Sequence, residues 1–333
     1  MSNKQTKVIS VLNMKGGVGK TTLTTNLATE LASRNKKVLV LDVDPQFNTT
    51  QTLFKFATDN LTDYHKIQKR HRTISGIVQN SDTLSGVVQE DDDLVLSESV
   101  RPSEVAKSNP FIFTLTLQLP EIPTLSSASA SKQKVSIDII PGDLKLIVDV
   151  NASSADKLSA FFYDTGLIGE KYDYILIDCP PTWSQLTSIA LSKSTHYLIP
   201  TNLDEFSTMG ISILTEQLAT KNSSMGGSLK CLGIVYMFLN TTTSPTGITR
   251  KQTPYKSSLE KYVKETMVEK LDNPVHIFQT MFHKDNFFVT SSTIYRSLGK
   301  TPYERRKYSA FAELASNLTD EILVQLDQIE EVK

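Results

Sequence analysis

A glycine-rich segment at residues 14–22, Met-Lys-Gly-Gly-Val-Gly-Lys-Thr-Thr, constrains the fold more than any other part of this sequence. An apolar run at Val8–Asn13 precedes it, and leucines at helical spacing follow it over Thr21–Arg34. We therefore expect a turn between a buried strand and a helix. Glycines let successive N–H groups point at an anion there, and the helix adds its positive end. The segment predicts a phosphate-binding loop.

Two residues of this loop supply the chemistry that a bound nucleotide needs. Lys20 can neutralise charge on β- and γ-phosphates, and the Thr21 hydroxyl can bind Mg²⁺. Met14 stands where the general pattern G-x-x-x-x-G-K-[ST] has glycine, so a strict motif search misses the loop. The expected nucleotide-binding residues of the loop are Lys15, Gly16, Gly17, Val18, Gly19, Lys20, Thr21 and Thr22.

Acidic residues end two further apolar runs. Val38–Leu41 leads into Asp42 and Asp44, and Tyr174–Ile177 leads into Asp178. Open α/β sheets bind ligands beyond the carboxyl ends of their strands. A carboxylate at the end of a buried strand needs a partner, and a magnesium–nucleotide complex would provide one.

Short apolar runs alternate with longer amphipathic stretches, a pattern typical of βαβ units around a parallel sheet. Consecutive apolar positions, as in Val38–Leu41, suit strands that are covered on both faces. We predict the α/β class, with a doubly wound, mostly parallel sheet and helices on both faces. The expected strands are Val8–Asn13, Lys37–Asp42, Val135–Ile140, Tyr172–Asp178, Thr195–Pro200, Leu229–Leu239 and Val275–Gln279. The expected helices are Thr21–Arg34, Glu205–Thr220 with Met209, Ile213 and Leu214 facing the core, and Ala310–Ile329.

One region departs from this rhythm. Between about residues 59 and 134 the chain carries a basic cluster, the acidic run Glu90–Asp93, the serine-rich segment Ser126–Ser131 and four prolines. We interpret it as partly mobile surface structure inserted into a single domain that spans residues 1–333.

Three of these segments resemble motifs of the ParA/MinD superfamily of P-loop ATPases. Residues 15–22 resemble its deviant Walker A motif, residues 41–50 its Walker A′ motif and residues 174–181 its Walker B motif. The resemblance covers nearly the whole chain apart from about residues 103–134. It implies a Mg²⁺-dependent ATPase that hydrolyses ATP to ADP and phosphate.

The resemblance also implies catalytic roles for three residues. Lys15 is similar to the family's signature lysine, which reaches across an ATP-sandwich homodimer to the partner's phosphates. Lys20 would hold the phosphates, and Asp44 would orient and polarise the attacking water.

Metal and base contacts follow from the same resemblance. Thr21, Asp42 and Asp178 would organise Mg²⁺, largely through its water ligands. Pro200 and Asn202 resemble the family's strand end and loop near the nucleotide base. Residues 282–284, Phe-His-Lys, stand where the family has an Ile-Pro-Arg-type turn, so the adenine contacts differ here.

Within the superfamily the chain is most similar to ParA-type partition ATPases. This implies an ATP-dependent homodimer that binds duplex DNA without sequence preference and a ParB-like partner that stimulates hydrolysis during plasmid or chromosome partition. The expected location is cytoplasmic and nucleoid-associated, without a membrane. Because the first strand begins near residue 8, we expect no amino-terminal helix-turn-helix domain.

Two alternatives remain open at this point. A MinD-like membrane-associated positioning ATPase would need a basic carboxy-terminal amphipathic helix, whereas Asp320–Lys333 carries five acids and one lysine. A P-loop small-molecule ligase of the dethiobiotin synthetase type would not need Lys15. The two cysteines, Cys179 and Cys231, are not placed for the bridging cluster of iron–sulfur reductases with this fold.

DNA binding must overcome a net charge of -1, so the basic residues must be segregated. Basic residues outnumber acids in three segments, Asp63–Arg72, Arg250–Lys270 and Arg296–Tyr308. The family places its DNA contacts in the carboxy-terminal third of the chain. By that resemblance Arg250, Lys251 and Lys284 are the expected DNA-binding residues.

Overall fold

The computed structural model describes residues 5–79, 94–105, 109–120, 132–150, 153–169, 171–242, 247–290 and 293–331. Its strands are β1 (Lys7–Val11), β2 (Val38–Asp42), β3 (Val100–Pro102), β4 (Phe113–Pro120), β5 (Lys132–Ile140), β6 (Tyr174–Asp178), β7 (His196–Thr201) and β8 (Lys230–Tyr236). Its helices are α1 (Lys20–Ser33), α2 (Asn48–Thr58), α3 (Thr62–Lys69), α4 (Ile74–Gln79), α5 (Leu146–Asp149), α6 (Ser154–Asp164), α7 (Gln185–Lys193), α8 (Ser207–Ser224), α9 (Thr253–Tyr262), α10 (Val268–Leu271), α11 (Phe287–Thr290) and α12 (Pro302–Glu331). A π-helical turn, Val263–Met267, joins α9 to α10.

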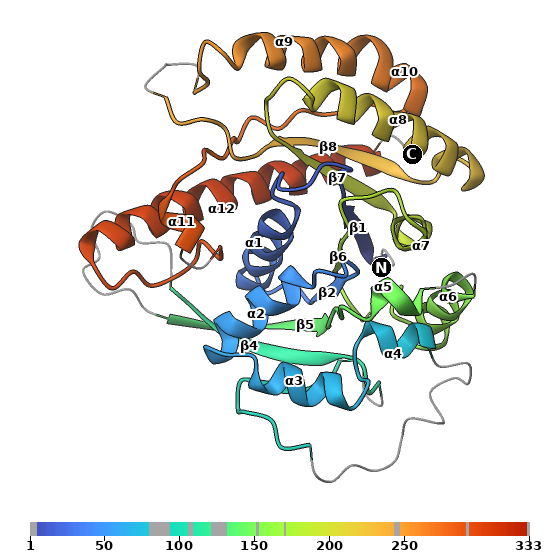
Figure 1. Cartoon of the computed structure of the whole chain (residues 1–333), viewed down its shortest axis with the longest axis vertical. Coiled ribbons are helices and arrows are strands. Elements are labelled where there is room, and N and C mark those ends of the chain that lie inside the picture. Colours follow the sequence, from blue (N-terminus) through green and yellow to red (C-terminus); the bar gives the residue numbers. More distant parts are fainter. Residues whose placement is uncertain are drawn as a thin grey trace.

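The described strands form one sheet in the order β3-β4-β5-β2-β6-β1-β7-β8 (Figure 1). All neighbours from β5 to β8 are parallel, whereas β3, β4 and β5 pair antiparallel. This arrangement confirms the predicted mostly parallel, doubly wound sheet. Because parallel strands end at the same edge, the residues that follow β1, β2 and β6 lie close together.

Each central strand contributes to two separate hydrophobic cores. In β2, Val38 and Val40 pack with α1, α2 and α12, whereas Leu39 and Leu41 pack with α4, α6 and α7 on the other face. The alternation is set by the strand geometry, in which successive side chains point to opposite faces. Helices on both faces explain why these strands are apolar at every position.

The description of residues 59–134 as surface structure was wrong for much of its described part. Strand β4 joins the sheet beside β5 and is buried at seven of its eight positions. Tyr64 and Ile67 of α3 are fully buried as well. The acidic run and the serine-rich segment lie outside the described residues. Alternation of Phe, Leu and Thr at Phe113–Pro120 was the overlooked strand signal.

Two further expectations require correction. Val275–Gln279 is not a strand and makes only the isolated bridge between Ile277 and Ile234. The next amides donate to another partner, because the Glu321 carboxylate on α12 accepts from the N–H groups of Gln279 and Thr280. Helix α8 turns Ile211, Leu214 and Leu218 to the core, while Met209 and Ile213 are exposed.

Helix α12 is the longest described helix and crosses the sheet face beside α1 (Figure 1). Its Asp320 accepts a hydrogen bond from Arg34 at the end of α1, at 2.5 Å. Glu330 forms an ion pair with Lys7 of β1. No helix in the described part of the chain has the length and apolar character needed to cross a membrane.

Strand β4 offers a direct test of the revised core. Leu117→Ala should lower the free energy of unfolding by about 2–5 kcal/mol, because the removed side chain is completely buried. Gln118→Ala on the exposed side of the same strand should change it by less than about 0.5 kcal/mol. Chemical denaturation of both variants measures the difference, and equal values would contradict a structural role for this strand.

Candidate nucleotide-binding site

The loop at residues 12–19 connects β1 to α1 and depends on glycine at two positions. Gly17 and Gly19 have φ angles of 72° and 90°, in the left-handed region that residues with a Cβ rarely adopt. A Cβ on Gly19 would also lie 3.1 Å from the side chains of Met237 and Phe238. Gly16 and Gly17 are exposed while Val18 is buried, so the loop is anchored on one side and open on the other.

Lys20 begins α1 and is almost completely buried. Its Nζ donates to the Lys15 carbonyl oxygen at 3.3 Å. Burial lowers the pKa of Lys20, and the negative charges of Asp178 and Asp44 oppose that shift. The ammonium group is thus aimed at the same small region as the carboxylates of the strand ends.

Asp42 and Asp178 are paired neighbours at the ends of β2 and β6, and both are fully buried. One oxygen of each is well bonded. Asp42 Oδ2 accepts from Thr50 N and Oγ1 at 2.7 and 2.8 Å, and Asp178 Oδ2 accepts from Thr49 and Thr21 hydroxyls at 2.6 and 2.8 Å. The other oxygen of each carboxylate has no hydrogen-bond partner in the described part of the chain.

Burial raises the pKa of both carboxyl groups above the ordinary value for an aspartate. Burial raises the pKa of Asp178 to about 6, against the hydrogen bonds from Thr49 and Thr21. Burial and the neighbouring charge of Asp178 raise the pKa of Asp42 well above its usual range. A cation that binds the two unpartnered oxygens, directly or through water, would stabilise both ionised carboxylates and so lower the pKa of each.

These oxygens fit a magnesium ion that is shared with a nucleotide. Mg²⁺ takes oxygen ligands, keeps several waters and usually binds one or two carboxylates together with substrate phosphates. Thr21, Asp42 and Asp178 supply oxygens of that kind beside the phosphate-binding loop. Within the described ranges, no three His, Cys, Asp or Glu side chains form a group that could hold a metal ion by themselves.

Asp44 lies two residues beyond β2 and is 7% exposed. Its Oδ1 accepts from the Gln46 N–H at 2.9 Å. Burial raises the pKa of Asp44, while the bond from Gln46 and the charge of Lys20 lower it. Asp44 lines a cavity of about 390 Å³, together with Pro45, Pro180, Pro181 and other residues. A carboxylate near the loop with open space beside it is suited to hold a water molecule.

A second cavity, of about 420 Å³, lies on the other side of the loop. It is lined by Gly17 of the loop, Thr22 of α1, Asn202 after β7, and the aromatic rings of Phe238 and Tyr295. Its apolar and polar walls suit a nucleotide base and sugar. Asn202, predicted to lie near the nucleotide base, is among the lining residues, and its contact with the base stays a prediction. Pro200 is buried in β7, outside the cavity lining, and its carbonyl oxygen accepts from Asn13 at 2.8 Å.

Comparison with known proteins agrees with this geometry. Residues 6–231 match a family model described as an AAA domain. Over 230 residues the chain is 28% identical to the chromosome partitioning protein ParA of Myxococcus xanthus, a match that covers 69% of this chain and 64% of that protein. The chain belongs to the ParA-like family of P-loop ATPases.

Two solved structures share the fold at low sequence identity. The structure of pNOB8 ParA bound to nonspecific DNA is 18% identical with a TM-score of 0.57, over 97% of this chain and 99% of that one. Cobyrinic acid a,c-diamide synthase from Mycobacterium smegmatis, with bound ATP analogue and magnesium, is 16% identical with a TM-score of 0.54, over 92% and 93%. At these identities the likeness concerns the fold alone.

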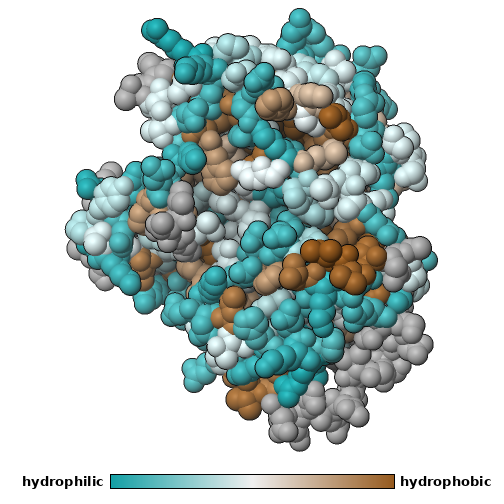
Figure 2. Space-filling model, in the orientation of Figure 1, coloured by the Kyte–Doolittle hydropathy of each residue, from teal (hydrophilic) through white to brown (hydrophobic). Residues whose placement is uncertain are grey.

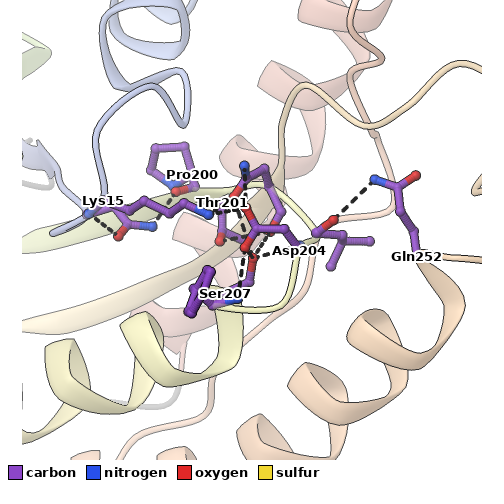
Figure 3. Close-up of polar contacts among 10 residues, drawn as sticks. Lys15, Pro200, Thr201, Asp204, Ser207 and Gln252 are labelled. Atoms are coloured by element: carbon purple, nitrogen blue, oxygen red, sulfur yellow. Dashed lines mark hydrogen bonds and ion pairs between the residues drawn. The ribbon is translucent and has the colours of Figure 1, made fainter.

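In this ParA-like chain, Lys15 lies at the mouth of the loop and contacts its own chain (Figure 3). Its Nζ donates to Asn202 Oδ1 at 3.1 Å and forms an ion pair with Asp204. Although partial burial works in the opposite direction, hydrogen bonds from Lys15 and Ser207 lower the pKa of Asp204.

The three expected DNA-binding residues lie in one part of the molecule. Arg250 and Lys251 are exposed immediately before α9. Lys284 is exposed in the segment after β8, and its neighbour His283 contacts the Gly247 carbonyl oxygen at 2.5 Å. This contact joins the two segments that carry the three cations.

Some other basic residues of the predicted segments form ion pairs with acidic residues of the same chain. Arg296 binds the buried Glu30 of α1 through two hydrogen bonds, at 2.5 and 3.0 Å. Lys66 pairs with Asp63, and Lys307 pairs with Asp285.

Three residues that belong to the site were not identified from the sequence. Thr49 and Thr50 stood within the Walker A′ match, and adjacent hydroxyl residues at a helix start after a strand-end acid were a usable signal. Asp204 follows β7 as Asp44 follows β2, but its role depends on a distant lysine that no local pattern identifies.

Burial of Asp178 predicts a pH-dependent stability. Its folded pKa of about 6 exceeds the ordinary 3.8, so the folded state binds the proton more tightly and loses stability as pH rises between these values. Asp178→Asn without nucleotide should therefore gain stability relative to wild type, on the order of 2 kcal/mol by neutral pH. Denaturation at about pH 3.5 and about pH 7.5, on either side of that window, measures the gain.

The exposed Glu313 of α12 provides a matched control. Glu313→Gln removes one acid and should show no comparable gain at either pH. An Asp178→Asn variant that is no more stable than wild type at neutral pH would contradict the proposed cost of the buried carboxylate.

Proposed function

We propose that this chain is a magnesium-dependent ATPase that acts as one unit, forms an ATP-sandwich homodimer, binds duplex DNA non-specifically and drives plasmid or chromosome partition with a ParB-like partner. One observation carries the proposal. Lys20 and Thr21 of the loop lie beside three carboxylates, Asp42, Asp44 and Asp178, at a single edge of the sheet. Membership of the ParA-like family supports the rest.

Hydrolysis needs a positioned water and a site that tolerates charge on the γ-phosphate. The Asp44 carboxylate is the group that can accept a hydrogen bond from the attacking water and aim its lone pair. The ammonium of Lys20 and the loop N–H groups stabilise the phosphate oxygens. Thr21, Asp42 and Asp178 would hold Mg²⁺, which would supply further neutralisation of phosphate charge.

Two features support a homodimer. Lys15 lies at the rim of the loop with its side chain 28% exposed, so the ammonium group can reach a second subunit. Apolar side chains are exposed on both sides of this rim, with Leu144, Ile147 and Val148 at α5 and Phe206 and Met209 at α8. Figure 2 shows a hydrophobic patch at the position that α5 has in Figure 1. Exposed apolar surface of this kind marks interaction sites.

DNA binding is supported by the exposed cations at Arg250, Lys251 and Lys284. Phosphate contacts made by a few exposed side chains carry no sequence information, so the binding should tolerate any duplex. The described structure of pNOB8 ParA is a complex with nonspecific DNA, which agrees with this proposal. A partition role would place the protein in the cytoplasm, on the nucleoid.

The catalytic roles can be separated by two substitutions. Asp44→Ala should retain ATP binding and dimerisation but lose about 100-fold or more in turnover, because only the water-positioning interaction is removed. Lys20→Ala should lose productive nucleotide binding itself. Measurements of the ATP dissociation constant and of kcat for both variants decide the matter. An equal loss of ATP affinity in the two variants would refute these assignments.

The DNA contacts can be tested through salt dependence. The Arg250→Gln/Lys251→Gln double variant should bind duplex DNA more weakly with ATP, and its log–log salt slope should fall by about one for each lost phosphate contact. ATP-driven dimerisation should be unchanged. The control is Lys55→Gln/Lys134→Gln, which removes the same charge from exposed positions on α2 and β5, outside the three basic segments. An unchanged slope in the first variant would exclude these residues from the DNA interface.

A further inference from the structure

Lys15 already has a partner on its own chain. Its ammonium group contacts Asn202 and Asp204, both in the loop that joins β7 to α8 (Figure 3). The side chains of Lys15 and Asp204 are 28% and 40% exposed, so the pair is reachable by water and by a competing anion. A single ammonium group cannot keep this position and also reach a nucleotide on a second subunit.

The acceptor side of this contact is built independently of Lys15. Asp204 Oδ1 accepts from the Phe206 N–H and the Ser207 hydroxyl, each at 3.0 Å. The Leu203 carbonyl oxygen accepts from the buried amide of Gln252 at 3.3 Å. The loop is therefore held in place by α8 on one side and by Gln252 on the other (Figure 3).

The backbone that carries Lys15 is also fixed. The Lys15 N–H donates to Asn13 Oδ1 at 3.0 Å, and Asn13 Nδ2 donates to the Pro200 carbonyl oxygen at 2.8 Å. Asn13 thus ties the start of the loop to the end of β7. Only the long side chain of Lys15 has to swing for the ammonium group to leave Asp204.

We propose that Asp204 is a latch that stores Lys15 on its own subunit until an ATP-bound second copy competes for it. The inference rests on the proposed function, since it concerns the regulation of the same homodimer. Dimerisation then requires each subunit to exchange the Asp204 carboxylate for phosphate oxygens across the interface. Asp204 acts through Lys15 and is a positioning residue that sets the threshold for dimer formation.

The size of the effect follows from the exposure of the pair. A partly exposed ion pair shifts an equilibrium by up to about fivefold, and a dimer releases two latches. At about 1.4- to 5-fold for each pair, loss of both latches should therefore favour the dimer by about 2- to 25-fold.

The test is sedimentation of the full chain with Mg²⁺ and a non-hydrolysable ATP analogue. Asp204→Asn keeps an oxygen for Phe206 and Ser207 but removes the charge that holds Lys15. We expect its dimer dissociation constant to fall by the factor above. Asp204→Glu keeps the charge and should return the constant toward the wild-type value. Glu205→Gln removes the same charge from the exposed neighbouring residue and should leave the constant unchanged.

A second comparison separates the latch from a merely structural role. Compared with Lys15→Gln alone, Lys15→Gln/Asp204→Asn should show no gain in whatever dimerisation remains, because the latch acts only through Lys15. Unchanged or weaker dimerisation of Asp204→Asn beside a normal wild-type dimer would overturn the latch alone, as would a gain that persists without Lys15. A wild-type chain that stays monomeric with the analogue would overturn the proposed homodimer and the latch with it.

Discussion

In the register of the parallel pairs β1–β6 and β6–β2, Val11, Asp178 and Asp42 are neighbours at the ends of three strands. This pairing brings the residue before the phosphate-binding loop beside two carboxylates that are far away in sequence. A shift of one residue in either pair would turn an aspartate toward a hydrophobic core. The catalytic arrangement therefore depends on strand register before it depends on any individual contact.

Neighbouring elements supply the hydrogen bonds that stabilise the two buried carboxylates. Thr49 and Thr50 open α2 and donate to the two buried acids. Phe47, with a φ angle of 41°, turns the chain into that helix and stacks on Tyr64 of α3 with ring centroids 5.3 Å apart. Tyr64 in turn donates to the Gly142 carbonyl oxygen at 3.1 Å. A helix from the region expected to be a surface insertion thus supports the carboxylate site.

Sequence reasoning succeeded where the signal is local. The loop glycines, the acids at the ends of apolar runs and the strands covered on both faces all follow from patterns shorter than 15 residues. It failed where distant residues decide the outcome. Val275–Gln279 has the composition of a strand, yet Glu321 accepts the amide hydrogens of Gln279 and Thr280. Pairing of β4 with β5 and the contact of Lys15 with Asp204 likewise depend on chain segments that no local pattern connects.

The loop after β7 gives the proposed cycle a physical connection between nucleotide and DNA. It receives Lys15 from the phosphate-binding loop and is bonded through Leu203 to Gln252, one residue beyond Lys251. Gln252 also accepts from the Asn240 N–H at 3.3 Å, so the start of α9 and the segment that follows β8 share this anchor. Under the proposed function, a few cations on one subunit would bind DNA weakly, and a dimer would double their number on one surface. The proposed control of Lys15 would then also control how many cations act together on the duplex.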